Sequence, residues 1–176
     1  MPRIACKIAE IPAELAAYYT IRQAVFVDEQ GMFHGTDVDE RDAQAIHIVA
    51  VDEETGSVVG GVRCYFDPEW GEDTWFGGRL TVRQDYRHKG AQVGPLLVRA
   101  AERAVQERGC RCFLAHIQVQ NVKFFERLGW HTVGEPQPLH GFPHQMMEAH
   151  FSWLNRNSHI ADSVSPIADS LSHTIK

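Results

Sequence analysis

A turn that carries a glycine and leads from a strand-like run into an amphipathic helix constrains this chain most. It spans residues 86–94 and has the sequence YRHKGAQVG. Such a turn leaves main-chain N–H groups unpaired at the start of the helix, where the helix dipole adds to their attraction for an anion, most often a phosphate. Arg87, His88 and Lys89 bring positive charge to its entrance. The turn therefore predicts a strand–loop–helix unit that binds a cofactor with a diphosphate.

The length and charge of the chain narrow the class of protein. With 176 residues, we expect one domain over residues 1–154 and a flexible C-terminal tail over residues 155–176, where the sequence becomes serine-rich. A net charge of −6 argues against broad binding to nucleic acid or to anionic membranes, which needs a basic face. Since no apolar run reaches the roughly 20 residues of a membrane span, we expect a cytoplasmic protein.

The four cysteines form no C-x-x-C pair that would indicate a metal site or a redox motif. Zinc ligation by some of them with the ten histidines is an alternative. Buried free thiols are the favoured interpretation, and we expect no metal.

The spacing of apolar residues, together with glycine and proline stops, predicts the order of the elements. Helices are expected from Pro12 to Gly31, from Pro95 to Gly109 and over residues 121–128. Gly77-Gly78 predicts a bulge or a close backbone approach. The acidic run from Asp37 to Asp42 is expected to be a solvated loop, and its alternative is a segment that attracts a cationic substrate. The expected strands are residues 3–9, 46–51, 58–66, 75–82, 112–119, 130–133 and 145–151.

Four segments, in the correct order, resemble the GNAT superfamily of N-acetyltransferases. Residues 87–92 (RHKGAQ) resemble its nucleotide loop, and residues 121–130 (NVKFFERLGW) resemble its N-x-x-x-F-Y-E-x-L-G-F element. Residues 22–30 (RQAVFVDEQ) and 141–147 (GFPHQMM) are similar to the ElaA-like branch. The resemblance covers about residues 3–151. It implies an α/β (α+β) fold of the GNAT type, with a mixed, mostly antiparallel central sheet of six to seven strands flanked by helices.

Two positions depart from the pattern of that superfamily. Gln92 stands where a glycine or alanine is usual, and the next glycine is Gly94. Phe125 stands where many relatives have a tyrosine that protonates the leaving thiolate, and a phenylalanine has no proton to donate. The general acid must therefore be another group or water.

The resemblance implies acetyl-CoA as the acyl donor. The amides of its pantetheine arm would pair with the exposed strand edge at residues 80–82, and a main-chain N–H near Leu80 could polarise the thioester carbonyl. Asn121 would hold the arm, with two phenylalanines packed on it. The expected cofactor-binding residues are Leu80, Thr81, Val82, Arg87, His88, Lys89, Gly90, Ala91, Gln92, Val93, Gly94, Asn121, Phe124 and Phe125.

An acceptor amine must lose a proton because an ammonium ion is not nucleophilic, so a base is needed. His116 shares one face of its strand with Gln118 and is the first candidate; its alternative is a hydrogen-bonded core histidine. Glu29 is the second, as a base or as the anion that docks the amine, and its alternative is a solvated helix end or a partner for Arg22. His144 is the third, and it could instead complete the substrate pocket.

The resemblance predicts an N-acetyltransferase that transfers the acetyl group to a primary amine of a small molecule by direct attack in a ternary complex. Two alternatives remain open: a non-catalytic acyl-CoA-binding module and an acyl-chain transferase related to autoinducer synthases. The expected partner is the small-molecule amine, without nucleic acid or membrane, and a homodimer is a further possibility.

Overall fold

The computed structural model describes residues 1–88 and 90–151. Three α-helices are α1 (Pro12–Arg22), α2 (Val93–Gln106) and α3 (Val122–Arg127). A π-helical segment (Gln23–Glu29) continues α1, and 3₁₀ turns cover Glu40–Ala43, Gln84–Tyr86 and Val119–Asn121. The strands are β1 (Ile4–Ile8), β2 (Ile46–Asp52), β3 (Ser57–Phe66), β4 (Thr74–Val82), β5 (Cys112–Gln118), β6 (His131–Thr132), β7 (Gln137–Leu139) and β8 (Phe142–Glu148).

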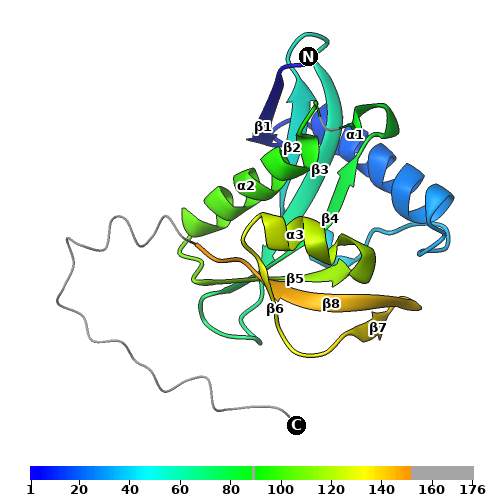
Figure 1. The fold of residues 1–176 in the computed structure, drawn as a ribbon. Helices are drawn as coiled ribbons and strands as arrows, with labels where there is room; N and C mark the ends of the chain where they lie inside the picture. The colour runs from blue at the N-terminus through cyan, green and yellow to red at the C-terminus, as the bar shows by residue number, and fades with distance from the viewer. Residues whose placement is uncertain (89, 152–176) are drawn as a thin grey trace, which may run out of the picture.

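One mixed sheet forms the centre of the molecule. Seven strands follow one another in the order β1-β2-β3-β4-β5-β8-β6, and β7 pairs with β8 (Figure 1). All the pairs are antiparallel except β4 with β5. The expected fold class, a mostly antiparallel GNAT-type sheet with flanking helices, is therefore confirmed.

Helices cover both faces of this sheet. Adjacent residues of a strand point to opposite faces, and a Cβ atom on Gly60 would meet Val93 and Leu97 of α2, whereas one on Gly61 would meet Tyr18 of α1. α2 and α1 thus lie on opposite faces (Figure 1). The main apolar core fills the space under α2 and includes Phe125 of α3.

The sheet divides between β4 and β5. Their parallel pairing covers only Thr74–Gly77 against Cys112–Ala115, and the register ends there. Beyond it β4 stays paired with β3, and β5 stays paired with β8. The two strands therefore separate at mid-sheet, and main-chain groups of β4 that face the split have no strand beside them.

A bulge in β4 lies at this split. Gly61 pairs with Thr81 and Arg63 pairs with Gly78, so Val62 of β3 faces two residues of β4, Arg79 and Leu80. Arg79 has φ 53°, a left-handed conformation that few residues other than glycine adopt. A bulge was expected at the Gly77-Gly78 pair, and the structure has it directly after that pair.

Most expected elements are present, with changes at their ends. The helix expected up to Gly31 loses regular α-geometry after Arg22, and the strand expected at 145–151 begins earlier, at Phe142. The tail at 155–176 lies outside the described residues. Within the described part of the chain, none of the helices has the length and apolar character needed to cross a membrane.

Candidate active site

Two hollows open on either side of the split. We call them the loop groove, of about 750 Å³, and the central cavity, of about 390 Å³. Leu80 at the bulge, Asn121 after β5 and Phe125 of α3 line both of them. The hollows therefore meet at the point where β4 and β5 separate.

The loop groove contains most of the residues expected to bind the cofactor. It lies between β4, the N-terminus of α2 and α3. Of the expected residues, Gly90 and Ala91 do not line it, and Lys89 lies outside the described residues. Those that line it are Leu80, Thr81, Val82, Arg87, His88, Gln92, Val93, Gly94, Asn121, Phe124 and Phe125.

The start of α2 supplies donors to this groove. Helix geometry leaves the first N–H groups of α2, which begins at Val93, without partners inside the helix. Gln92 before it has φ 55°, the left-handed conformation that glycine adopts most easily, which accounts for the glycine usual at this position. A Cβ atom on Gly94 would lie 3.3 Å from Phe124 Cζ, so the groove is narrow there.

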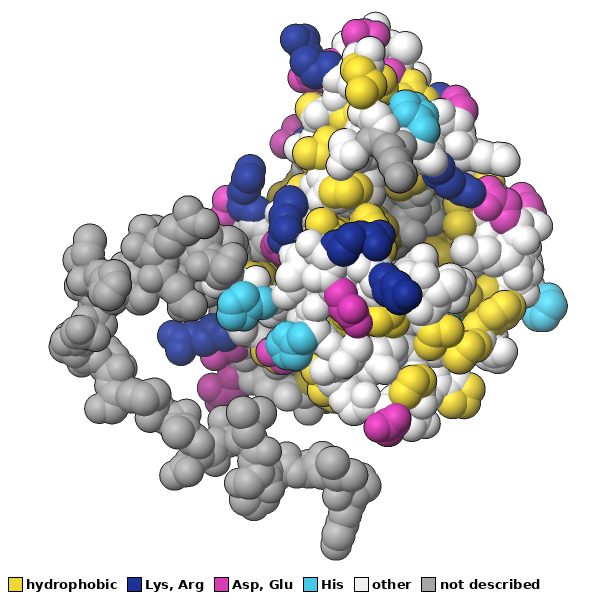
Figure 2. All heavy atoms as spheres, in the orientation of Figure 1, with side chains coloured by type: hydrophobic (Ala, Val, Ile, Leu, Met, Phe, Trp, Pro, Cys, Tyr) yellow, Lys and Arg dark blue, Asp and Glu magenta, His cyan; other side chains and the backbone are white. Residues whose placement is uncertain are grey.

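Positive charge borders the loop groove. Figure 2 shows Lys and Arg side chains gathered across the face that carries α2 and α3. Arg87 and Arg127 line the groove itself. Nε of Arg87 donates to the carbonyl of Val82 over 2.7 Å, which fixes the guanidinium beside β4.

Glu29 lies in the loop groove and apart from the central cavity. Its two carboxylate oxygens each accept a hydrogen bond of 2.9 Å from Arg87, and this pairing lowers the pKa of Glu29. The partner expected for Glu29 as a structural residue was Arg22, and the structure gives Arg87 instead. Next to it, Gln118 of β5 donates to the side chain of Gln30 over 3.0 Å.

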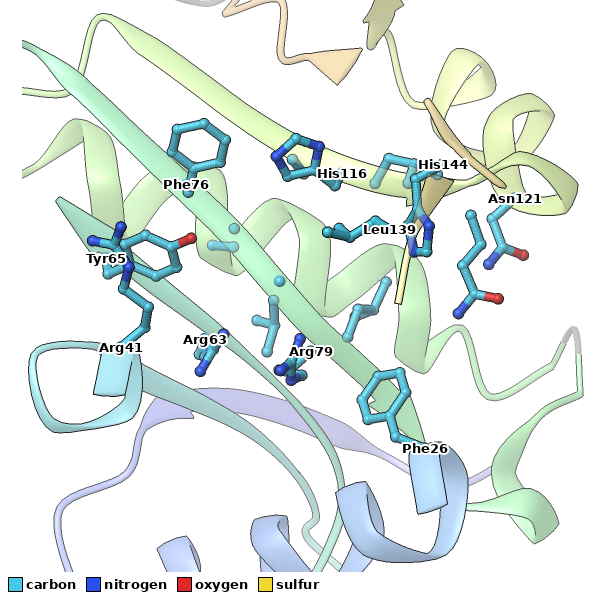
Figure 3. Close-up of a pocket in the computed structure, with 18 of the residues that line it drawn as sticks. Phe26, Arg41, Arg63, Tyr65, Phe76, Arg79, His116, Asn121, Leu139 and His144 are labelled. Carbon is cyan, nitrogen blue, oxygen red and sulfur yellow. The ribbon is translucent and has the colours of Figure 1, made fainter. Parts of the chain in front are cut away.

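The central cavity runs from the split to β3. Figure 3 shows Arg41, Tyr65 and Phe76 at one end and Asn121 and His144 at the other. Tyr65 stacks on Phe76 at 6.0 Å between ring centroids, and Phe76 stacks on His116 at 5.6 Å. A row of flat rings therefore crosses three strands along one wall.

His116 and His144 both line this cavity. The residues opposite them in the β5–β8 register are Met146 and Gln118, which places the two histidines diagonally on one face of the sheet. Although part of His116 is open to solvent, its ring lies against Phe76, and this loss of water lowers its pKa; the charge of His144 acts in the same direction. His116 is therefore neutral at pH 7.

A main-chain hydrogen bond fixes the tautomer of His144. The side chain is buried, and its Nδ1 lies 2.8 Å from the carbonyl oxygen of Phe142. A carbonyl oxygen can only accept, so Nδ1 carries the proton and Nε2 of the neutral ring has a free lone pair. The sequence makes His144 only the third candidate for the base, because no sequence signal indicates this hydrogen bond.

A buried ion network lies behind the cavity wall, which it reaches through Asp39, Arg63 and Arg79. Arg22 donates to Asp37 at 2.8 Å and to Asp42 at 2.7 Å. The expectation that Asp37 to Asp42 form a solvated loop is wrong for Asp37 and Asp42, which are buried, whereas Asp39 and Glu40 between them are exposed. Burial would raise the pKa of Asp42, but the hydrogen bonds from Arg22 outweigh it and hold that pKa well below its usual value.

Two arginines of the sheet complete this network. Arg63 of β3 donates to both oxygens of Asp39, at 2.5 and 2.9 Å. Nε of Arg79 at the bulge donates to Asp37 over 3.0 Å. Arginines that lie far apart in the sequence are thus joined to one short acidic segment. Arg63 within an apolar strand is the signal from which a buried ion pair could have been suspected.

Among the residues that the structure describes, no group of three or more His, Cys, Asp or Glu side chains is placed to hold a metal ion. The acidic groups Asp37, Asp39 and Asp42 pair with Arg22, Arg63 and Arg79.

A strand bulge beside a split sheet, with a helix N-terminus at the far end of the split, defines a GNAT-type acetyltransferase. The model of the acetyltransferase (GNAT) family matches residues 13–130, and the chain belongs to that family. A relative from Bacillus subtilis (strain 168), provisionally named as an acetyltransferase, is 34% identical over 137 residues, which cover 76% of this chain and 88% of the relative.

Solved structures agree with this assignment. A provisionally named N-acetyltransferase from Lactobacillus plantarum is 26% identical and has a TM-score of 0.72, with 83% of this chain and 97% of that chain covered. ElaA of Escherichia coli has a TM-score of 0.70 at 21% identity, with 85% of this chain and all of that chain (100%) covered. The likeness to ElaA shows the fold alone. ElaA belongs to the branch that the sequence resembles.

Proposed function

We propose that this protein transfers the acetyl group of acetyl-CoA to a primary amine of a small molecule, by direct attack while both are bound. The observation that carries the proposal is the meeting of the two hollows at Leu80, Asn121 and Phe125. A donor in the loop groove and an acceptor in the central cavity would touch each other only there. The open β4–β5 split supplies the passage.

The residues of the loop groove fit coenzyme A. Its diphosphate would take the N–H groups at the start of α2 and the guanidinium of Arg87. The side of β4 away from β3 at residues 80–82 offers main-chain groups to the amides of the pantetheine arm, although the carbonyl of Val82 already accepts from Arg87. When bound, acetyl-CoA would supply the acetyl thioester at the junction of the hollows.

The central cavity then supplies groups for the acceptor. His116 lies directly after the last β4–β5 pair and is neutral at pH 7, so it is our candidate for the base that takes the proton of the amine. His144, with its free Nε2, is the second group that can take it. The N–H of Leu80 would donate to the carbonyl oxygen as negative charge develops there.

The leaving thiolate needs a proton, and this chain has no tyrosine at the position from which many relatives supply it. Phe125 is buried at the junction of the hollows and donates none. Water in the loop groove is our candidate for this proton.

A thiol-release assay with acetyl-CoA and a panel of small amines tests the proposal. We expect turnover with at least one amine and its loss in His116→Ala together with His144→Asn. Calorimetry on the same sample separates the alternatives: tight acetyl-CoA binding with no thiol release on any amine would indicate the non-catalytic module. Turnover with long-chain acyl-CoA and none with acetyl-CoA would indicate an acyl-chain transferase.

A further inference from the structure

The conformation of Arg79 at the bulge requires restraint. An L-residue in the left-handed region is unfavourable, and such residues persist where surrounding contacts hold them. Here the residue lies within β4, lines the central cavity and directly precedes Leu80, which lines both hollows. Two sets of contacts hold it, one on its carbonyl group and one on its side chain.

Tyr18 of α1 holds the carbonyl. Its hydroxyl donates a 2.7 Å hydrogen bond to the main-chain oxygen of Arg79, and its ring is fully buried. The ring reaches this oxygen by crossing β3 at Gly61, where any Cβ atom would collide with it. Burial raises the pKa of Tyr18 far above its ordinary value, so the hydroxyl keeps the proton that it donates.

The buried ion network holds the side chain of the same residue. Nε of Arg79 donates to Oδ2 of Asp37 over 3.0 Å, and its Nη2 donates to the main-chain oxygen of Asp37, also over 3.0 Å. Nε of Arg22 donates to the same Oδ2 over 2.8 Å. Because Asp37 and Arg22 are both buried, water does not compete for these hydrogen bonds.

The planarity of the peptide bond connects these anchors to the site. In a trans peptide the C=O group of one residue and the N–H group of the next point in opposite directions. Tyr18 draws the carbonyl of Arg79 towards α1, so the N–H of Leu80 points away from Tyr18, and Leu80 lines both hollows. A hydrogen-bonded peptide is also polarised, which makes its N–H a stronger donor.

We propose that Tyr18 is a positioning residue that aims the N–H of Leu80 at the carbonyl oxygen of the acetyl thioester, with Asp37 and Arg22 holding the side chain of Arg79. This inference rests on the proposed function and deepens it. It gives a role to Asp37 and Arg22, two buried charges that line neither hollow.

Tyr18→Phe is the variant that tests this role, with Tyr19→Phe as its matched control. Tyr19 is the next residue of α1, and the centroid of its ring lies 4.8 Å from Cζ of Arg22. Its hydroxyl makes no hydrogen bond to any residue that the structure describes. In Tyr18→Phe we expect kcat to fall by about 10- to 100-fold, since loss of an oxyanion donor costs up to about a thousandfold. The KM for acetyl-CoA and the Kd of CoA should change less than about twofold.

An infrared measurement keeps the test separate from the proposed function. With carbonyl-¹³C-labelled acetyl-CoA bound and no amine present, the thioester C=O band should shift to lower wavenumber in the wild type and in Tyr19→Phe. It should return towards its free position in Tyr18→Phe. A protein that binds acetyl-CoA without transferring it would still show this difference, so failure of turnover alone leaves the positioning role measurable.

Two results would overturn the inference. One is a kcat and a band position in Tyr18→Phe equal to those of Tyr19→Phe. The other is an equal loss of CoA affinity and kcat, which a merely structural role would produce. If Tyr18→Phe does not fold, Arg79→Gly takes its place: glycine accepts this φ without strain but lacks the side-chain anchor. We expect a folded protein with a broadened, less shifted band, and an unchanged band would count against the proposal.

Discussion

The ion pair between Arg87 and Glu29 in the loop groove predicts that the wild-type protein binds coenzyme A more weakly than a variant without Glu29. Arg87 donates two hydrogen bonds to Glu29, and a diphosphate would have to replace that carboxylate. Arg87 would remain in place without Glu29, because its Nε is held by the carbonyl of Val82. Glu29→Gln should therefore leave a preformed cation free for the ligand.

The size of this effect follows from the exposure of the pair. The two side chains are 36% and 38% exposed, and pairs of this kind contribute about 0.2–1 kcal/mol. At 1.4 kcal/mol for each factor of ten, removal of the competing carboxylate should tighten CoA binding by about 1.4- to 5-fold. The gain should shrink as salt is added, because exposed charges are screened.

Isothermal titration of CoA into wild type and Glu29→Gln, at low and high salt, measures this gain. Glu107→Gln, an exposed residue just after α2, is the control for the loss of one negative charge and should have little effect. Weaker CoA binding in Glu29→Gln would refute the reasoning. Unchanged CoA affinity with a fall in kcat of about 10²-fold or more would instead support Glu29 as a base.

Two further predictions concern the central cavity. Gly78 lines the cavity and a Cβ atom on it would meet nothing within 4 Å, so Gly78→Val should keep its melting temperature and CoA affinity while acetyl transfer falls. The matched Gly77→Val would place Cβ 2.9 Å from Phe113 and should lose about 1–3 kcal/mol in urea unfolding; equal stability of the two variants would contradict this. If His116 is the base, kcat should fall as pH drops through its lowered pKa, since the protonated ring accepts no proton. This acidic limb should lie below pH 6.5, the ordinary histidine value, and vanish in His116→Ala. A limb above pH 6.5, or one that persists, would exclude that role.

The parts of the site that the sequence predicted are those formed by continuous segments. Residues 86–88 and 92–94, at the start of α2, and Asn121 lie in one groove because each follows directly from a strand or leads into a helix. Local signals such as glycine, proline and apolar spacing were enough to place these elements. The membership of the GNAT family, carried by four short motifs, is confirmed.

The buried charges could not be placed in this way. Acidic runs are usually solvated, and Asp37 is buried only because Arg22 and Arg79, far from each other in the sequence, meet at it. Local propensity was also insufficient to place the bulge. The glycine pair predicted it at Gly77-Gly78, whereas the residue with the left-handed conformation is Arg79. The left-handed conformation is held there by Tyr18, a contact over 61 positions that no spacing rule contains.

The β7–β8 hairpin forms part of the wall of the central cavity through Leu139, His140 and His144, and it contributes nothing to the lining of the loop groove. It also comes after every segment that shapes that groove. Changes in the length or composition of the hairpin would therefore remodel one hollow and spare the other. Substitutions or length changes near the C-terminal end of the sheet can therefore alter the acceptor cavity while the residues that line the donor groove stay unchanged.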